Sequence, residues 1–333
     1  MKITLNELTE LTDKALRNYG YTDEEIPIIR QALFYAQLRG NNQGVVKLIG
    51  AGMPKSPDAG EIAIVKETPV SARIDGSGNQ AMVVMKKAVT VALAKAKHSG
   101  FAIVGTCNTS TSSGAVGNYA MQLAQEGYIG LVFGRSTERV AMYGSFEPVF
   151  GTNPIAIGIP CQPSPVVLDM STAAISYFGL VEAKTAGRKI PADMAYDARG
   201  CATDDPAAAI QGAIRSFDRS YKGSGLALMA EILAGPLAGA AFAGIGNSKK
   251  NWGHLLIAID PELLGDRDEF SANVAAMAAK IKSTKRLPGV DEIFVPGERE
   301  EQLARQCLES GEIDIENNLL EGLRLAAQPR GEC

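Results

Sequence analysis

The stretch from Phe150 to Ser176, FGTNPIAIGIPCQPSPVVLDMSTAAIS, contains two short apolar runs bounded by turn-forming residues. The runs are Ile155–Ile159 and Val166–Leu168. Pro154 precedes the first run, and Pro160, Pro163 and Pro165 lie between the two. Apolar runs of about four to eight residues between such breaks are typical of buried strands. The second run leads directly into Asp169, Met170, Ser171 and Thr172, which bring a carboxylate and two hydroxyls. Because polar groups at a strand end can hold a ligand, we expect this stretch to form the floor of a binding site.

Helices and strands alternate on both sides of this stretch. Apolar periodicity predicts helices over 5–18, 26–38, 82–98, 118–126, 226–237, 268–283 and 298–306, with a short alanine-rich helix after Asp205-Pro206. Strands are expected over 61–74, 101–104, 128–133, 255–259 and 293–295. Thr22 and Glu25 have the spacing of a capping box before the second helix. This alternation predicts an α/β or α+β fold.

Composition and charge exclude several classes of protein. The chain has 333 residues, 46% of them hydrophobic, which is ordinary for a globular enzyme. With a formal net charge of -4 and no dense Lys/Arg block, we expect no nucleic-acid partner. No apolar run reaches about 18 residues, and the N-terminal MKITLNELTELTDKAL is amphipathic and acidic, unlike a signal peptide. We therefore expect a cytoplasmic protein with no membrane partner.

The scarcity of histidine limits the chemistry. His98 and His254 are the two histidines of the chain; His98 is expected to cap a helix at its C-terminus, and His254 to be structural. The five cysteines are scattered without CxxC spacing, so neither a zinc site nor a disulfide framework is expected. No metal is expected. No GxGxxG follows a predicted strand, and so a Rossmann dinucleotide fold has no local support.

Nine collinear segments, however, resemble the malate/L-lactate dehydrogenase family of the non-Rossmann type. That family also includes ureidoglycolate, sulfolactate and 2,3-diketogulonate dehydrogenases and the piperideine/pyrroline-2-carboxylate reductases. The segments cover nearly the whole chain: LRGNNQGVVKL (38–48), RIDGSGNQ (73–80), SGAVGNYA (113–120), GSFEPVFGTNPIAIGIP (144–160), VVLDMSTAAIS (166–176), AYDARGCATDDPAAAIQG (195–212), SYKGSGLALMAEILAGPLAGA (220–240), GHLLIAIDP (253–261) and PGVDEIFVPGERE (288–300).

The resemblance implies an α+β fold in which a mainly antiparallel sheet binds NAD or NADP and a helical domain joins the two ends of the chain. It places the helical domain at 1–72 and 262–333 and the NAD(P)-binding domain at 73–261, in a homodimer. By resemblance, the cofactor lies on Asp169, Met170, Ser171, Thr172, Lys222, Gly223, Gly297, Glu298 and Arg299. Hydroxyls and backbone N–H groups suit ribose and phosphate, and Lys222 suits a diphosphate. Without the resemblance, Lys222 would be interpreted as a solvated loop lysine.

The chain departs from the family pattern at the substrate side. The family usually has Ser-His-Gly where this chain has Asn42-Gln43-Gly44, and that histidine is the expected proton donor. An arginine that binds the substrate carboxylate is replaced by Lys47. A second active-site histidine is missing from a slightly longer loop at 111–114, where Ser112 stands.

These departures have a chemical consequence. Hydride delivery to a ketone leaves an alkoxide, which needs a proton from a nearby acid, and Gln43 has no proton to give. A protonated imine becomes a neutral amine directly, so no acid is needed in that step. Lys47, Asp197 or a water are alternative donors, since burial lowers the pKa of a lysine.

We therefore expect an NAD(P)H-dependent oxidoreductase that reduces a small 2-oxo acid or the corresponding imine. Gln43, Lys47, Ser112 and Asp197 are the candidate catalytic residues. Asn42, Lys47 and Arg135 are the candidate substrate contacts; Arg135 can fork onto a carboxylate or pair with Glu138. The alternatives are an ordinary L-2-hydroxyacid dehydrogenase with a substitute donor, and a cofactor-binding protein without turnover.

Overall fold

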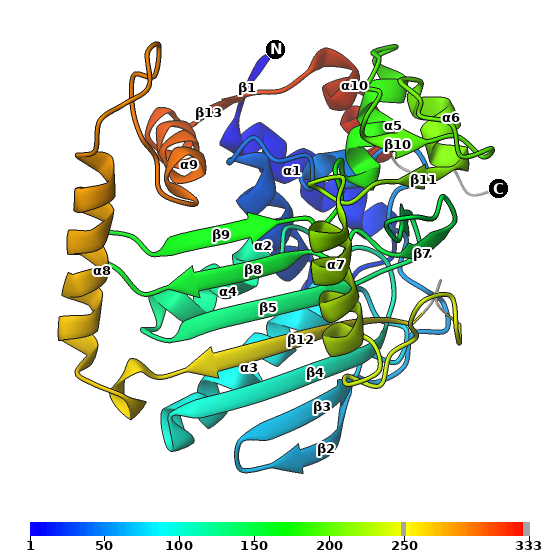
Figure 1. Ribbon diagram of the computed structural model, residues 1–333. Helices are drawn as coiled ribbons and strands as arrows, with labels where there is room; N and C mark the ends of the chain where they lie inside the picture. Colours follow the sequence, from blue (N-terminus) through cyan, green and yellow to red (C-terminus); the bar gives the residue numbers. More distant parts are fainter. Residues whose placement is uncertain (248–250, 329–333) are drawn as a thin grey trace.

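The computed structural model describes residues 1–247 and 251–328, and its largest element is a seven-stranded sheet (Figure 1). The strands lie in the order β2, β3, β4, β12, β5, β8, β9, and neighbouring strands are antiparallel except β3 and β4. Their bounds are β2 Ala63–Thr68, β3 Ser71–Asp75, β4 Phe101–Thr109, β5 Ile129–Arg135, β8 Ile155–Ile159, β9 Val166–Met170 and β12 Trp252–Ile259. The mainly antiparallel α+β architecture is therefore confirmed.

The two apolar runs around which the prediction was built form β8 and β9. They pair with each other, from Ile155 opposite Met170 to Ile159 opposite Val166. β9 lies at the edge of the sheet and ends at Met170, so Asp169 is still within the strand.

Helices cover both faces of this sheet. On one face, α3 (Ala81–Ser99) and α4 (Gly117–Gln125) pack against the central strands and enclose a core of small and aliphatic side chains. On the other face, α7 (Tyr221–Ala234) crosses β5 and β12 (Figure 1). No described element covers the outer side of α7, and several of its apolar side chains there are exposed.

The two ends of the chain share a second hydrophobic core. It joins α1 (Leu5–Asn18), α2 (Glu25–Gln37) and the 3-10 helix η1 (Val45–Leu48) to α9 (Glu298–Ser310) and α10 (Asn317–Ala326). A two-stranded sheet of β1 (Lys2–Thr4) and β13 (Glu312–Asp314) ties the same segments together. The capping box before α2 is confirmed, because the backbone N–H of Thr22 donates to Glu25 Oε2 at 2.9 Å and the N–H of Glu25 to Thr22 Oγ1 at 3.4 Å. The domain division at 72/73 and 261/262 stays a prediction; within 1–72, β2 belongs to the large sheet.

A third, smaller core lies above one end of the sheet. Its four-stranded sheet has the order β10 (Ala195–Tyr196), β11 (Ala213–Ile214), β6 (Val140–Ala141) and β7 (Pro148–Phe150). The helices α5 (Tyr177–Thr185) and α6 (Pro206–Gln211) pack beside it. The remaining elements are the 3-10 helix η2 (Pro261–Leu263) and α8 (Arg267–Lys282), which buries none of its residues.

Several predicted boundaries were wrong, each for a local reason. The stretch 61–74 is a hairpin, because Thr68 Oγ1 accepts from the backbone N–H of Ser71 and turns the chain. The strand expected at 101–104 continues to Thr109, because β12 pairs with its polar half. The stretch 293–295 is not a strand, and α9 is followed by α10 and so is not the final helix.

Two helices were missed or misplaced. The predicted polar region after Ser176 contains α5, whose inward face is short and offers only Leu180 and Ala183 to the core. α7 begins at Tyr221, ahead of the predicted Leu226, because Ser220 Oγ accepts from the backbone N–H of Lys222 as an N-cap. Among the described helices, none has both the length and the apolar character needed to span a bilayer.

Candidate functional site

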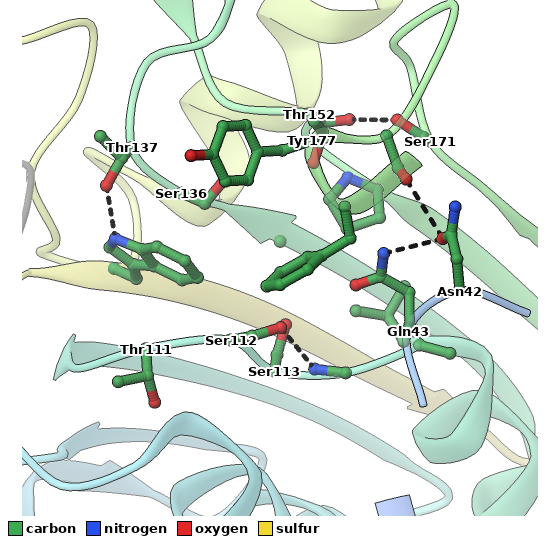
Figure 2. A pocket seen from close by; sticks show the side chains of 18 of the residues that line it. Asn42, Gln43, Thr111, Ser112, Ser113, Ser136, Thr137, Thr152, Ser171 and Tyr177 are labelled. Carbon is green, nitrogen blue, oxygen red and sulfur yellow. Dashed lines mark hydrogen bonds between the residues drawn. The ribbon is translucent and has the colours of Figure 1, made fainter. Parts of the chain in front are cut away.

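A cavity of about 360 Å³ opens where the three cores meet. Its walls come from the loop after α2, the loop after β4, the end of β5 and the first turn of α5 (Figure 2). Polar, charged and aromatic side chains line it, among them Asn42, Gln43, Ser112, Ser136, Arg139, Asp169, Ser171, Tyr177 and Phe178. The volume is in the range that small ligands occupy.

Asn42 and Gln43, both predicted from the sequence, form one wall of this cavity. Gln43 Nε2 donates to Asn42 Oδ1 at 3.2 Å, and the hydroxyl of Ser176 donates to the same oxygen at 3.1 Å (Figure 2). Ser112 lies on the neighbouring wall, where its Oγ accepts from the backbone N–H of Gly114 at 3.1 Å. None of the described residues in the cavity wall is a histidine. The part of the wall formed by Asn42, Gln43 and Ser112 therefore offers neutral amides and a hydroxyl, while Arg135, Arg139 and Asp169 line the cavity elsewhere.

The two histidines lie elsewhere and are not available as acids. His98 is exposed in the last turn of α3. His254 is buried in β12, with Nδ1 2.9 Å from Thr106 Oγ1. Burial, together with the nearby Arg135 cation, lowers the pKa of His254 to about 3. The imidazole is therefore neutral at physiological pH.

Asp169 connects this cavity to a second one. Its Oδ2 accepts from the backbone N–H of Gly117 at 2.9 Å, and a Cβ at position 117 would lie 2.7 Å from that oxygen. Burial raises the pKa of Asp169 to about 6, with the hydrogen bond from Gly117 acting in the opposite direction. Asp169 and Asn41 line both cavities, so the two spaces adjoin.

The second cavity, of about 550 Å³, contains two more of the predicted cofactor residues. Gly297 and Arg299 line it, beside Phe294, Val295 and Pro296. Gly297 has a φ of 80°, and a Cβ there would lie 2.6 Å from the carbonyl oxygen of Val167. The glycine is therefore required for the α9 start to approach β9 this closely.

Of the other predicted cofactor residues, one lines the first cavity and the rest lie outside both cavities. Ser171 lines the first cavity, whereas the Thr172 hydroxyl is buried and donates to the backbone carbonyls of Thr152 and Asn153. Met170 pairs in β9 with Ile155, and Glu298 forms an ion pair with Lys282 outside both cavities. Lys222 and Gly223 belong to the first turn of α7, not to a loop as predicted, and line neither cavity. Within one chain, the structure thus brings together Asp169, Ser171, Gly297 and Arg299.

Arg135 is held by carboxylates. Its side chain is buried, with Nη2 2.7 Å from Glu138 Oε1 and Nε 3.3 Å from Glu231 Oε1. Of the two predicted alternatives, the ion pair with Glu138 is the one present, joined by a second carboxylate from α7. Arg135 lines the cavity, but its guanidinium is already paired with these two carboxylates, with which a substrate carboxylate would have to compete.

Lys47 is covered by an aromatic ring. Its side chain is 2% exposed, and its Nζ has no hydrogen-bond partner among the residues that the structure describes. That atom lies 3.6 Å from the centre of the Phe178 ring. Burial holds the pKa of Lys47 well below its usual range. The desolvation of the charged amine therefore acts more strongly on the pKa than the attraction between a cation and the ring, which would raise it. Since Phe178 lines the cavity and Lys47 does not, the ring separates the amine from the cavity.

Asp197 is also outside the cavity. It pairs with Arg199 at 3.0 Å and accepts from the backbone N–H groups of Arg199 and Cys201, which lowers its pKa. A carboxylate held in its ionised form is a poor proton donor.

Sequence reasoning missed the aromatic and basic part of the wall. The Trp252 indole donates to Thr137 Oγ1 at 3.0 Å (Figure 2), and the Arg139 guanidinium lies 4.4 Å from the centre of the Tyr177 ring. The sequence did contain a signal for a cation in the wall. The charged loop 135–139 has two arginines and one glutamate, so one arginine could remain without an ion pair within the loop.

Comparisons with known proteins agree with this geometry. The family model described as malate/L-lactate dehydrogenase matches residues 3–324. The chain is 36% identical over 340 residues to malate/(S)-sulfolactate dehydrogenase of Methanothermus fervidus, covering 97% of this chain and 96% of that protein. It is 27% identical to the Δ(1)-pyrroline-2-carboxylate/Δ(1)-piperideine-2-carboxylate reductase of Pseudomonas putida, with coverage of 97% and 96%. The solved sulfolactate dehydrogenase of Methanocaldococcus jannaschii superposes with a TM-score of 0.80 at 31% identity, covering 98% of this chain and 96% of that one.

Proposed function

The chain belongs to the malate/L-lactate dehydrogenase family and is an NAD(P)-dependent oxidoreductase, and we propose that it reduces a small 2-oxo acid or, preferentially, the corresponding imine. Relatives of both kinds are similar to it along almost their whole length: a malate/(S)-sulfolactate dehydrogenase and a reductase of cyclic imino acids. The choice between ketone and imine therefore depends on the residues that face the substrate.

The residues of the two adjoining cavities suit a nicotinamide dinucleotide. Asp169 stands at their junction with its carboxylate facing both, and the backbone approaches closely at Gly117 and Gly297. When bound, the cofactor supplies the hydride. We propose that Asp169 and Ser171 hold it near the substrate cavity, and that Gly297 and Arg299 hold its other end.

The single observation that carries the imine proposal is the neutral wall around Gln43. Its amide is engaged with Asn42, Lys47 is shielded by Phe178, and His254 is neutral and buried. Asp169, whose pKa is raised to about 6, is the carboxyl among the described lining residues, and we assign it to the cofactor rather than to the substrate oxygen. Reduction of a ketone leaves an alkoxide that needs a proton from such a group. Reduction of a protonated imine yields an amine and needs none, so Gln43 has only to accept or donate a hydrogen bond.

We further propose that the protein works as a homodimer. Apolar side chains on the outer face of α7 are exposed to between 38% and 64%, namely Tyr221, Leu226, Met229 and Ile232. They recur on one side of the helix, and an exposed apolar stripe of this kind is typical of a protein–protein interface. Lys222 in the same helix would then contribute from this interface.

Turnover assays with NADH and with NADPH test the proposal. The substrates are pyruvate, oxaloacetate and 2-oxoglutarate, each with and without ammonia or methylamine, and cyclic imino acids. We expect oxidation of the reduced cofactor with at least one of them, and faster oxidation when an amine or a cyclic imine is supplied. Turnover of bare 2-oxo acids at equal rates would favour an ordinary 2-hydroxyacid dehydrogenase. Cofactor binding by calorimetry without any turnover would favour a non-catalytic, cofactor-binding role.

A further inference from the structure

The cavity contains one cation that the sequence-based assignment did not use. On the basis of the proposed function, we propose that Arg139 binds the carboxylate of the substrate, in place of the predicted Lys47 and Arg135. This names the residue that selects a 2-oxo or 2-imino acid over a neutral carbonyl compound at the same site.

Neither predicted cation is placed to bind a substrate anion. The Arg135 guanidinium is buried between Glu138 and Glu231, and a substrate carboxylate would have to displace one of these carboxylates. The Lys47 amine lies behind the Phe178 ring, with Nζ 3.6 Å from the ring centre, and Lys47 does not line the cavity. A substrate carboxylate in the cavity therefore meets the ring and not the amine, and burial also holds the pKa of Lys47 well below its usual range.

Arg139 differs from both. It lines the cavity, its side chain is partly exposed, and no carboxylate within residues 1–247 and 251–328 forms an ion pair with it. Its guanidinium stacks over Tyr177, with 4.4 Å between the guanidinium carbon and the ring centre. Stacking uses the face of the guanidinium and leaves the N–H groups at its edge available for a planar carboxylate.

The backbone around this pair is well held. The N–H of Arg139 donates to the carbonyl of Phe150, which fixes the start of β6 against β7. Tyr177 begins α5, and Ser176, the N-cap of that helix, also donates to Asn42. The stacked pair and the amide wall are therefore joined through one residue, and an acid anchored at Arg139 lies in the same cavity as Gln43.

The test uses oxamate, an unreactive analogue of a 2-oxo acid, titrated calorimetrically into the NADH-loaded protein. In Arg139→Gln, we expect oxamate affinity to fall about tenfold or more, because a charge-assisted contact is lost. Arg139→Lys should retain part of it. In turnover by Arg139→Gln, KM for the acid should rise far more than kcat falls. The kcat/KM for the methyl ester of the substrate, which has no carboxylate charge, should fall little. The matched control is Arg17→Gln, a surface arginine paired with Asp23.

The outcomes separate this inference from the proposed function. Unchanged oxamate affinity in both Arg139 variants, or no oxamate binding by the unaltered protein, would overturn the role of Arg139 even if the enzyme turns over. Weaker NADPH binding with unchanged oxamate binding would also overturn it, because the partner would then be a cofactor phosphate. Loss of oxamate binding in Arg139→Gln supports the inference even if no substrate of the panel is reduced.

Discussion

Gln43 is the residue on which the choice of substrate depends. It lies in the cavity wall, hydrogen-bonded to Asn42, and by the resemblance described above it stands where we expect the proton donor. An amide can orient a carbonyl or an imine but has no proton to release near neutral pH. Around it, the structure places hydroxyls and a second amide, and the carboxyl among the described lining residues is Asp169, which accepts from the N–H of Gly117 and which we assign to the cofactor.

Replacing Gln43 with histidine tests this directly. We expect Gln43→His to increase kcat/KM for a 2-oxo acid by about tenfold to a hundredfold, because a well-positioned general acid accelerates such a step by at least that much. The rate with a cyclic imine should change little. Steady-state rates with both substrates check this, and Gln43→Asn serves as the control that shortens the side chain without adding an acid. If the ketone rate does not rise, another donor already serves.

Lys47 is a buried amine for which the described part of the chain, residues 1–247 and 251–328, provides no hydrogen-bond partner. Leaving a buried donor unsatisfied costs about 1–3 kcal/mol, so Lys47→Met, which keeps the straight aliphatic chain, should raise the free energy of unfolding by about that amount at neutral pH. Urea denaturation measures it. Lys14→Met, at an exposed lysine paired with Glu10, should change stability by less than about 0.5 kcal/mol.

The same variant makes a pH prediction. Because burial lowers the pKa of Lys47 in the folded state, the unfolded chain binds more protons between that lowered value and 10.5. Folded-state stability should therefore rise with pH through this window, and Lys47→Met should lack that part of the rise. An identical pH dependence in both proteins would show that Lys47 is charged in the folded state.

At the level of elements, α7 carries two different surfaces. Its inner side provides Glu231, which holds Arg135, and its outer side presents Met229 and Ile232 to the surroundings. α7 thus connects the β5 end of the cavity to the face proposed as the dimer interface.

A charge on the outer face of α7 should break the dimer. We expect Ile232→Lys and Met229→Lys to shift the protein from dimer to monomer at micromolar concentration, because the lysine would be buried without a partner. Analytical ultracentrifugation measures this. Leu308→Lys, at a side chain 62% exposed on α9, is the control and should remain dimeric. A monomeric unaltered protein would refute the proposed assembly.

The elements were predictable where the pattern was local. The pairing of β8 with β9, the long α3 and the capping box before α2 follow from apolar spacing and turn residues within a few positions. α5 escaped prediction because it buries only two side chains and has little amphipathic pattern. The polar half of β4 escaped because its strand character comes from pairing with β12, more than 140 residues away.

The candidate site was predictable only in part, and the two arginines of one loop show why. Arg135 and Arg139 are equivalent by sequence and both line the cavity, yet Glu231, 96 positions further along the chain, pairs with the first, whereas the second stacks on Tyr177. Asn42 and Gln43 were singled out because the segment around them resembles the family while these two residues depart from its pattern. The shielding of Lys47 depends on Phe178, which a helix that the sequence did not predict brings into place.

In the whole molecule, the site lies where three hydrophobic cores meet. The ends of the chain supply Gln43 and Arg299, the large sheet supplies Asp169, and the smaller core supplies Tyr177 and Phe178. A substrate in this cavity therefore touches segments that are far apart in the sequence.

The most direct test of the imine proposal is the ratio of two specificity constants in the unaltered protein. The kcat/KM for a cyclic 2-imino acid is compared with that for a 2-oxo acid of the same carbon number, with the same reduced cofactor and at the same pH. A wall without an acid predicts a ratio well above one, about tenfold or more. A ratio of one or less would contradict it and show that this cavity protonates an alkoxide by a group other than those identified around Gln43.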